Sequence, residues 1–161
     1  MAKKKSSARK AAPKGRTTRP AKKGGTPKRS SARRAVAPAA ASRIGLITHT
    51  ELASHDPAAT QAWCAKVLGW KFAEPMPTPT GLYRMWRFAN NTGGGIRNLN
   101  PPETPGSIPY CEVKGIRAAF DKALAAGATA MLAPQEIPGG MGWIAIVAAP
   151  GGPPIGFWSQ S

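Results

Sequence analysis

Hydrophobic and polar positions in residues 44–72 follow a strand pattern, then a helix pattern, then the start of a second strand. His49 and Glu51 are two residues apart in the first of these segments. An extended chain therefore places an imidazole and a carboxylate on the same side. Asp56 followed by Pro57 is typical of a helix start, because aspartate accepts a free backbone N–H and proline loses no hydrogen bond there.

The helix after Pro57 is predicted from apolar residues at helical spacing and from a glycine at its end. Gly69 is the residue expected in the left-handed conformation that terminates many helices. The apolar residues would form one stripe packed behind the first strand. That stripe consists of Ala59, Trp63, Cys64, Val67 and Leu68.

The remainder of the first half predicts a strand at residues 82–88, a turn at 90–95 and a short strand at 96–99. A proline-rich loop is expected at 75–79. The second half repeats the order, with a strand at 108–113, a helix from Ile116 to a glycine at 127, and three further strands at 128–133, 141–148 and 155–159.

The two halves repeat at a period near 60 residues, since Tyr110 and Glu112 take the places of His49 and Glu51 at an offset of 61. We therefore predict an α+β fold of two βαβββ modules, about 44–99 and 108–161, related by a pseudo-twofold axis around a cleft. Together they make one domain, residues 44–161.

Charge separates this domain from the preceding residues. Residues 1–43 hold 15 of the 23 Lys and Arg and no Asp or Glu, whereas residues 44–161 hold the other 8 with all 7 acidic residues. The first 43 residues contain no aromatic side chain and many prolines and glycines, so they are expected to be a disordered tail. No run of about 20 apolar residues predicts a membrane span.

A basic chain of this kind is expected to bind polyanions by neutralising phosphates, without sequence specificity. The alternatives are a solubilising extension and a targeting peptide. The tail resembles the Lys/Ala/Pro-rich tails of linker-histone-like proteins. The candidate polyanion-binding residues are Lys3, Lys4, Lys5, Arg9, Lys10, Lys28, Arg29, Arg33 and Arg34.

Polar and aromatic side chains on the predicted strands are the candidates for a ligand site in the cleft. They are His49, Glu51, Trp86, Tyr110, Glu112, Trp143 and Trp158. The polar groups would hydrogen-bond a small ligand and the tryptophans would form flat apolar walls. The alternative is that the polar groups satisfy one another within the sheet and that the tryptophans are core residues.

Several motifs resemble the vicinal oxygen chelate superfamily, the group of glyoxalases, bleomycin-resistance proteins and extradiol dioxygenases, and most closely its two-module glyoxalase-like proteins and hydroxylases. The resemblance covers residues 44–160 and implies the two-module fold and pairing as dimers. It is carried by His49 with Glu51, Leu68-Gly69-Trp70, 93–96, 110–113, Ile137-Pro138-Gly139, Gly142-Trp143 and 150–158.

The resemblance also implies where a metal would bind in enzymes of the group, through His or Glu on the first and last strand of each module. His49 fills one such position. The other three hold Tyr110, the His- and acid-free segment 93–99, and Gly156. We therefore expect no metal or other cofactor, although Glu51 and Glu112 leave a divalent ion open as an alternative.

From the sequence, the leading hypothesis is a metal-independent, cytoplasmic protein that binds a small organic ligand between its modules, with a tail for nucleic acid. Whether it is an enzyme is left open. One alternative is a metal-dependent lyase, dioxygenase or hydroxylase of the glyoxalase group. The other is a nucleoid-associated protein that acts through the tail and uses the folded domain only as an anchor.

Overall fold

The computed structural model describes residues 41–161, and the candidate polyanion-binding residues of the tail lie outside this range. The first module consists of β1 (Ile47–Ser54), α1 (Pro57–Leu68), β2 (Met76–Thr78), β3 (Gly81–Arg87) and β4 (Gly93–Asn98). The second consists of β5 (Gly106–Glu112), α2 (Ile116–Ala125), β6 (Thr129–Glu136), β7 (Trp143–Ala148) and β8 (Pro154–Ser159). The predicted pair of βαβββ modules is confirmed.

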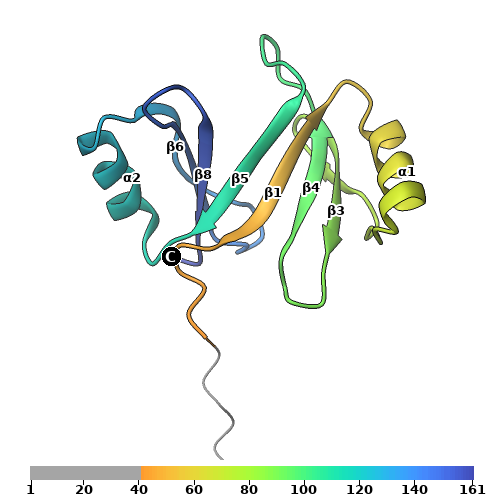
Figure 1. Ribbon diagram of the computed structural model, residues 1–161, viewed down its shortest axis with the longest axis horizontal. Helices are drawn as coiled ribbons and strands as arrows, with labels where there is room; N and C mark the ends of the chain where they lie inside the picture. The colour runs from red at the N-terminus through yellow and green to blue at the C-terminus, as the bar shows by residue number, and fades with distance from the viewer. Residues whose placement is uncertain (1–40) are drawn as a thin grey trace, which may run out of the picture. The chain divides into compact units, whose positions relative to one another are not determined.

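The strands of both modules join in one eight-stranded sheet with the order β2-β3-β4-β1-β5-β8-β7-β6. Each module pairs its first and last strands in parallel, β1 with β4 and β5 with β8, and the two first strands meet antiparallel at the centre (Figure 1). The second module thus repeats the strand order of the first. In the described part of the chain, no helix is long and apolar enough to cross a membrane.

Helix α1 begins and ends where the sequence predicts. The Asp56 carboxylate accepts from the Ala59 N–H at 2.9 Å, and Pro57 occupies the first helical position. Gly69 closes the helix at φ 68°, and its N–H donates to the Cys64 carbonyl. Both ends are therefore satisfied by local residues.

The predicted apolar stripe of α1 is not the side that packs on the sheet. Trp63 and Val67 are 57% and 56% exposed. The helix contacts the sheet through Pro57, Cys64 and two polar residues on the same side, Thr60 and Gln61, which hydrogen-bond Ser54 and Arg84. The prediction was wrong because these polar anchors, rather than apolar area, orient the helix.

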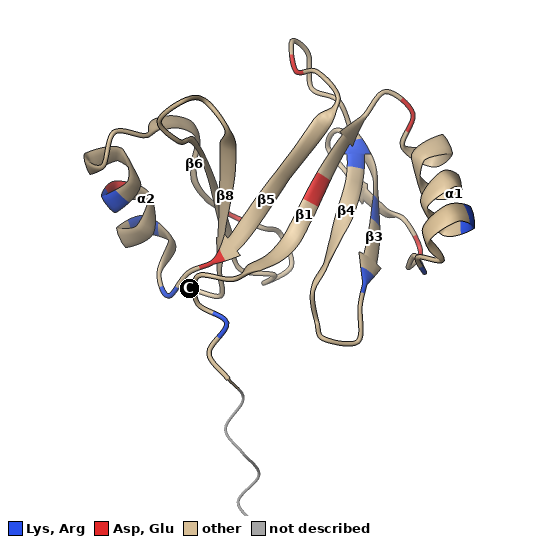
Figure 2. Ribbon diagram, viewed as in Figure 1, with Lys and Arg blue, Asp and Glu red and all other residues tan. Residues whose placement is uncertain are grey.

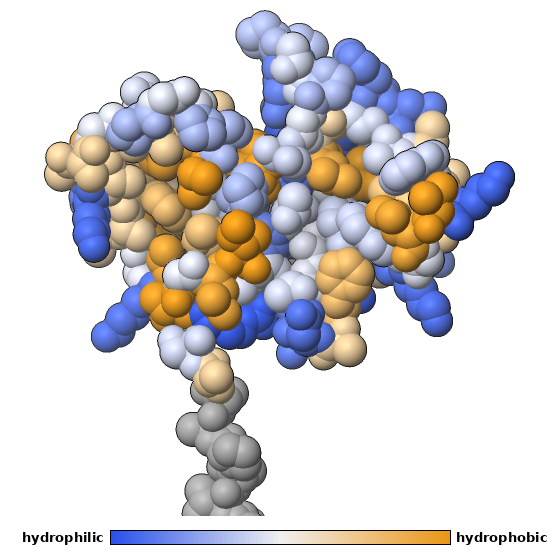
Figure 3. Space-filling view, in the orientation of Figure 1, coloured by the Kyte–Doolittle hydropathy of each residue, from blue (hydrophilic) through white to orange (hydrophobic). Residues whose placement is uncertain are grey.

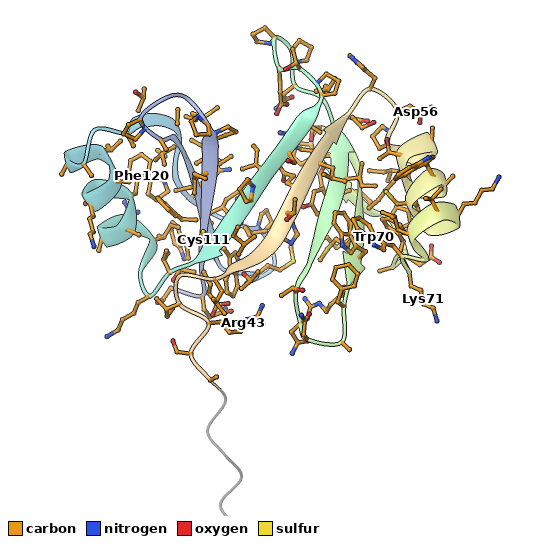
Figure 4. The ribbon with its side chains drawn as sticks, viewed as in Figure 1. Arg43, Asp56, Trp70, Lys71, Cys111 and Phe120 are labelled. Atoms are coloured by element: carbon orange, nitrogen blue, oxygen red, sulfur yellow. The ribbon has the colours of Figure 1, made fainter. Side chains whose placement is uncertain are left out.

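Helix α2 packs on its sheet as predicted. Ile116 and Phe120 are buried and pack with Ala145 and Val147 of β7. Phe120 lies between α2 and the strands of its module (Figure 4). At about 25 cal/mol per Å² of apolar area, burying such side chains supplies most of the module's stability.

The glycines at 93–95 form the start of β4, although the sequence predicted a turn there. A side chain on Gly94 would overlap the Thr50 carbonyl and the Trp86 ring, and one on Gly95 would overlap the Tyr83 ring. These glycines therefore let two aromatic rings lie directly on the backbone of a strand.

The segment between α1 and β3 also differs from the prediction. Phe72 makes only an isolated bridge with Trp86, and a short strand, β2, lies within the predicted proline-rich loop. Both cysteines are free thiols, and Cys64 is buried.

Candidate ligand-binding site on the open face of the sheet

The two helices cover the same face of the sheet, and the strand register identifies the residues of the opposite face. Arg84 bonds to α1, so the side chains adjoining it in sequence on β3, including Tyr83, point away from the helix. Phe157 packs with the core under α2, so Gly156 and its partner Tyr110 lie on the other side. We call that side the open face.

One row of paired residues crosses the centre of the open face on four strands. His49 of β1 pairs with Gly93 of β4 on one side and with Tyr110 of β5 on the other, and Tyr110 pairs with Gly156 of β8. The imidazole thus has glycine and tyrosine as its neighbours in the row. Gly156 leaves room for the Tyr110 ring, which occupies the space of a missing side chain.

The imidazole of His49 is held between two phenols. Its Nε2 lies 2.8 Å from the Tyr83 hydroxyl, the two rings are stacked at 6.4 Å, and the Tyr110 ring meets it edge-on at 5.8 Å. Burial, and then the positive charge of Arg87, lower the pKa of His49 to about 4. The imidazole is therefore neutral at pH 7.

The two phenols stay protonated at neutral pH. Burial raises the pKa of both Tyr83 and Tyr110 above the ordinary tyrosine value, and the nearby carboxylate of Glu51 raises it further. His49, Tyr83 and Tyr110 are thus uncharged groups that can donate or accept hydrogen bonds.

Beside this cluster, Arg97 lies between two carboxylates. Its Nε donates to Glu51 at 2.7 Å, and its two terminal nitrogens donate to the two oxygens of Glu103 at 2.6 Å each. Figure 2 shows the acidic position of β1 next to the basic position of β4. Hydrogen bonding to Glu103 is the largest cause of the raised Arg97 pKa, and the same bonds lower the pKa of Glu103. The guanidinium is charged and its direction is fixed.

The open face of the second module is apolar by contrast. Ile146 pairs with Gly156, and Ile144 pairs with Trp158, which places both isoleucines on the side of Tyr110. Ile108, paired with Glu51, continues the apolar surface to the centre of the sheet. A polar group bound at His49 would therefore have an aliphatic wall beside it.

Solved structures with this arrangement of strands and helices include a hypothetical protein from Bacillus halodurans C-125, with a TM-score of 0.59 and 12% identity over 71% of this chain and 94% of that one. They also include methylmalonyl-CoA epimerase of Streptomyces coelicolor, in complex with 2-nitronate-propionyl-CoA (0.55, 12%, 73% and 98%). A third is a glyoxalase/bleomycin resistance protein/dioxygenase superfamily member from Vibrio splendidus 12B01 (0.53, 17%, 68% and 95%). The domain has the vicinal oxygen chelate fold.

No protein-family model matches the sequence, and no curated protein matches it. The vicinal oxygen chelate fold is thus visible in the arrangement of the elements. At identities of 12 to 17%, the likeness extends to the fold alone.

The predicted site residues lie in three places. His49, Glu51 and Tyr110 come together at the centre of the open face, whereas Glu112 pairs with Arg43 at 3.4 Å. Trp158 is on the open face, and its indole nitrogen donates to the Met141 carbonyl at 3.0 Å.

Trp86 and Trp143 lie on the helix side of the sheet. Trp86 packs against Trp70 with ring centroids 4.4 Å apart, and Trp143 lies under Arg117, whose guanidinium is 5.6 Å from the ring centroid. Neither ring forms a wall of the open face.

Three residues of the site were not among the candidates, namely Tyr83, Arg97 and Glu103. Tyr83 lies on a strand whose two faces the sequence could not distinguish. Arg97 reaches Glu51 across 46 residues of sequence, and Glu103 comes from the loop after β4. The alternation of Gly93, Gly95 and Arg97 along β4 was a signal for Arg97, since it places a cation on the side of two glycines.

A divalent metal, which the resemblance implies for enzymes of this fold, does not fit the donor atoms of the open face. Gly93, Gly95 and Gly156 supply no ligand, the Glu51 carboxylate is bound by Arg97, and the His49 Nε2 is bound by Tyr83. Within residues 41–161, no group of three or more His, Cys, Asp or Glu could hold a metal ion. A ligand set would require breaking the Glu51–Arg97 pair.

Proposed function

We propose that the domain binds a small amphiphilic organic molecule on the open face without a metal. Its polar group would hydrogen-bond at His49, Tyr83 and Tyr110, and its apolar part would lie along Ile144 and Ile146. The observation that carries the proposal is the adjacency of an uncharged hydrogen-bonding cluster and an aliphatic wall on one face. Ligand sites commonly combine apolar walls with a few placed polar groups.

The charges at the site favour an uncharged polar head. Arg97 is already bound by two carboxylates, so it has little capacity left for a third anion. A cation would meet the dipoles of neutral phenols and imidazole rather than a free carboxylate. An amide or alcohol head can both donate to and accept from these groups.

A thermal-shift series of hexanamide, octanamide and the matching alkanes tests this proposal on the full-length chain. Octanamide should raise the melting temperature more than hexanamide, because the longer chain buries more apolar area, and the alkane should have little effect. Tyr83→Phe should lower the apparent affinity several-fold, since one hydroxyl is lost. Trp143→Phe is the matched control on the helix side and should leave the affinity unchanged.

Failure of every amide to shift the melting temperature would count against the proposal, as would equal shifts in wild type and Tyr83→Phe. Titration with Zn²⁺, Ni²⁺, Mn²⁺ and Fe²⁺ separates it from the enzyme alternative. We expect no stoichiometric binding that His49→Ala abolishes. Such binding would instead favour metal-dependent chemistry of the glyoxalase group.

A second proposal concerns the basic tail, which we infer binds nucleic acid without sequence specificity. It is supported by the concentration of 15 cations and no acid in residues 1–43. Replacing Lys28, Arg29, Arg33 and Arg34 by Gln should weaken binding to a duplex DNA and reduce its salt dependence. Replacing the four lysines of the domain by Gln is the matched control and should change little; an equal loss in both variants would contradict the proposal. Those lysines are Lys66, Lys71, Lys114 and Lys122.

A further inference from the structure

A pocket of about 260 Å³ opens where β1 separates from β4 in the first module. The two strands pair only from His49 and Gly93 onward, so the preceding residues of β1 have no partner in β4. Aromatic rings supply much of the lining, with threonines beside them. The lining includes Thr48, Thr50, Trp70, Trp86, Phe88 and Thr92, and we call it the aromatic pocket.

Trp86 is the fixed wall of the aromatic pocket. It is 4% exposed, with Trp70 stacked on it at 4.4 Å and Phe72 edge-on at 5.8 Å. Its six-membered ring also lies over Gly94, in the space that any side chain there would occupy. Packed in this way, the indole cannot rotate to find another hydrogen-bond partner.

The indole N–H of Trp86 is buried, and none of residues 41–161 accepts a hydrogen bond from it. A buried donor without an acceptor costs about 1–3 kcal/mol. The other tryptophan indole with a recorded bond, that of Trp158, donates to a backbone carbonyl. Trp86 therefore combines a fixed position, a cavity beside it and an unused donor.

We propose that the aromatic pocket binds a small, flat, uncharged molecule that carries one hydrogen-bond acceptor, and that this acceptor receives the Trp86 indole N–H. The lining contains no Lys, Arg, Asp or Glu, so nothing in it neutralises a charged ligand. A cavity of about 150 Å³ with apolar walls is large enough for benzene. A volume of 260 Å³ therefore accommodates one ring with a substituent.

The rim of the aromatic pocket gives access from solvent. Phe88 is 43% exposed and meets Trp70 edge-on at 5.7 Å. In Figure 4, Trp70 lies below α1 and beside the strands of the first module. The aromatic walls thus belong to the helix side of the sheet, so this site differs from the one proposed on the open face, and the two stand or fall separately.

Acetophenone and α-methylstyrene form a matched pair of probes, because they have the same shape and differ in a carbonyl oxygen against a methylene group. Each is titrated into the ¹⁵N-labelled full-length chain while the indole N–H signals are followed by NMR. We expect acetophenone to move the Trp86 signal saturably. α-Methylstyrene should bind at least about fivefold more weakly, because it leaves the donor unsatisfied.

Three variants locate the binding. Trp86→Phe removes the donor and should abolish the preference for acetophenone. Trp143→Phe and Glu51→Gln, on the second module's helix side and on the open face, should retain it. Should Trp86→Phe fail to fold, sequential assignment of the wild-type indole signals identifies Trp86, and the comparison of the two probes remains decisive. A Trp86 signal unmoved by acetophenone, or equal affinity for both probes, would overturn the proposal.

Discussion

The two modules share a backbone plan and differ in what their side chains do with it. In each, the first and last strands pair in parallel and the helix lies on the same face of the sheet. In the first module, Trp70, Trp86 and Phe72 form an aromatic cluster over glycines. In the second, Phe120 packs with aliphatic residues of the strands.

Their open faces differ in the same sense. The first module presents the His49 cluster and the Glu51–Arg97–Glu103 network, while the second presents isoleucines. A glycine stands on the last strand of each module in the central row, Gly93 and Gly156. Repetition therefore preserved the hydrogen-bonding register, and polar chemistry is concentrated on one half.

The exposed apolar side chains also distinguish the modules. Figure 3 shows them gathered over the outer side of α1 and around the start of β1. Trp63 and Val67 account for the first of these groups, and Leu46 and Ile47, each 56% exposed, belong to the second. Helix α2 has no comparably exposed large residue, since Leu124 is only 36% exposed.

The largest expected effect comes from comparing the two helices. Phe120→Ala should destabilise the domain by about 3–4 kcal/mol, because it removes a buried ring and leaves a cavity. Trp63→Ala should cost less than about 0.5 kcal/mol, because its side chain is mostly in solvent. Urea unfolding of both variants measures the difference, and equal losses would mean that α1 packs as tightly as α2.

The glycines of β4 give the next largest effect. Gly94→Ala should cost about 2–3 kcal/mol, because the added carbon would overlap the Thr50 carbonyl and the Trp86 ring. Gly106→Ala, at the start of β5, is the control and should change stability by less than about 0.5 kcal/mol, since the nearest atom is 3.8 Å away. A tolerated Gly94→Ala would show that the aromatic cluster can shift.

The same glycines show where the sequence misleads. A run of three glycines after two asparagines has the composition of a turn, and the two rings that require it lie on other strands or on the opposite side of the strand. Nothing local reports a tryptophan seven or eight positions away that covers the backbone. The signal would have been a request for space, which only the packed structure states.

The architecture was predictable because its signals are local. Alternating positions, the Asp56-Pro57 start, the Gly69 end and the 61-residue offset each depend on neighbours in sequence. The joining of Glu51 to Arg97 depends instead on the parallel register of β1 and β4, which the sequence does not state. The orientation of α1 was missed for the same reason, since Gln61 finds its partner on β3.

The ion pairs of the two first strands provide a smaller contrast. Glu51→Gln should cost about 2 kcal/mol, because Glu51 and Arg97 are 15% and 17% exposed and joined at 2.7 Å. Glu112→Gln should cost about 0.5 kcal/mol or less, because its pair with Arg43 is longer and wetter. Chemical denaturation at low and high salt checks both, and salt should weaken the Glu112 pair more. Equal costs would contradict the proposed difference in burial.

The smallest expected effect is a pH dependence that belongs to the first module alone. Because the pKa of His49 is lowered to about 4 in the folded state, the unfolded chain takes up a proton first as the pH falls below about 6.5. Protonation then favours unfolding, so stability is intact above pH 6.5 and declines toward pH 4. Between pH 7 and pH 5 the loss should be about 1 kcal/mol, with allowance for partial solvation of the ring.

His49→Gln removes this titration while keeping a side chain that can bond to the Tyr83 hydroxyl. Its unfolding free energy should therefore vary less between pH 7 and pH 5 than that of the wild type. His55, which is exposed at the start of α1, supplies the control, since His55→Gln should leave the wild-type slope unchanged. If the slope persisted in His49→Gln, the acid sensitivity would lie outside the His49 cluster, and the imidazole would be solvated enough to accept a proton without opening the sheet.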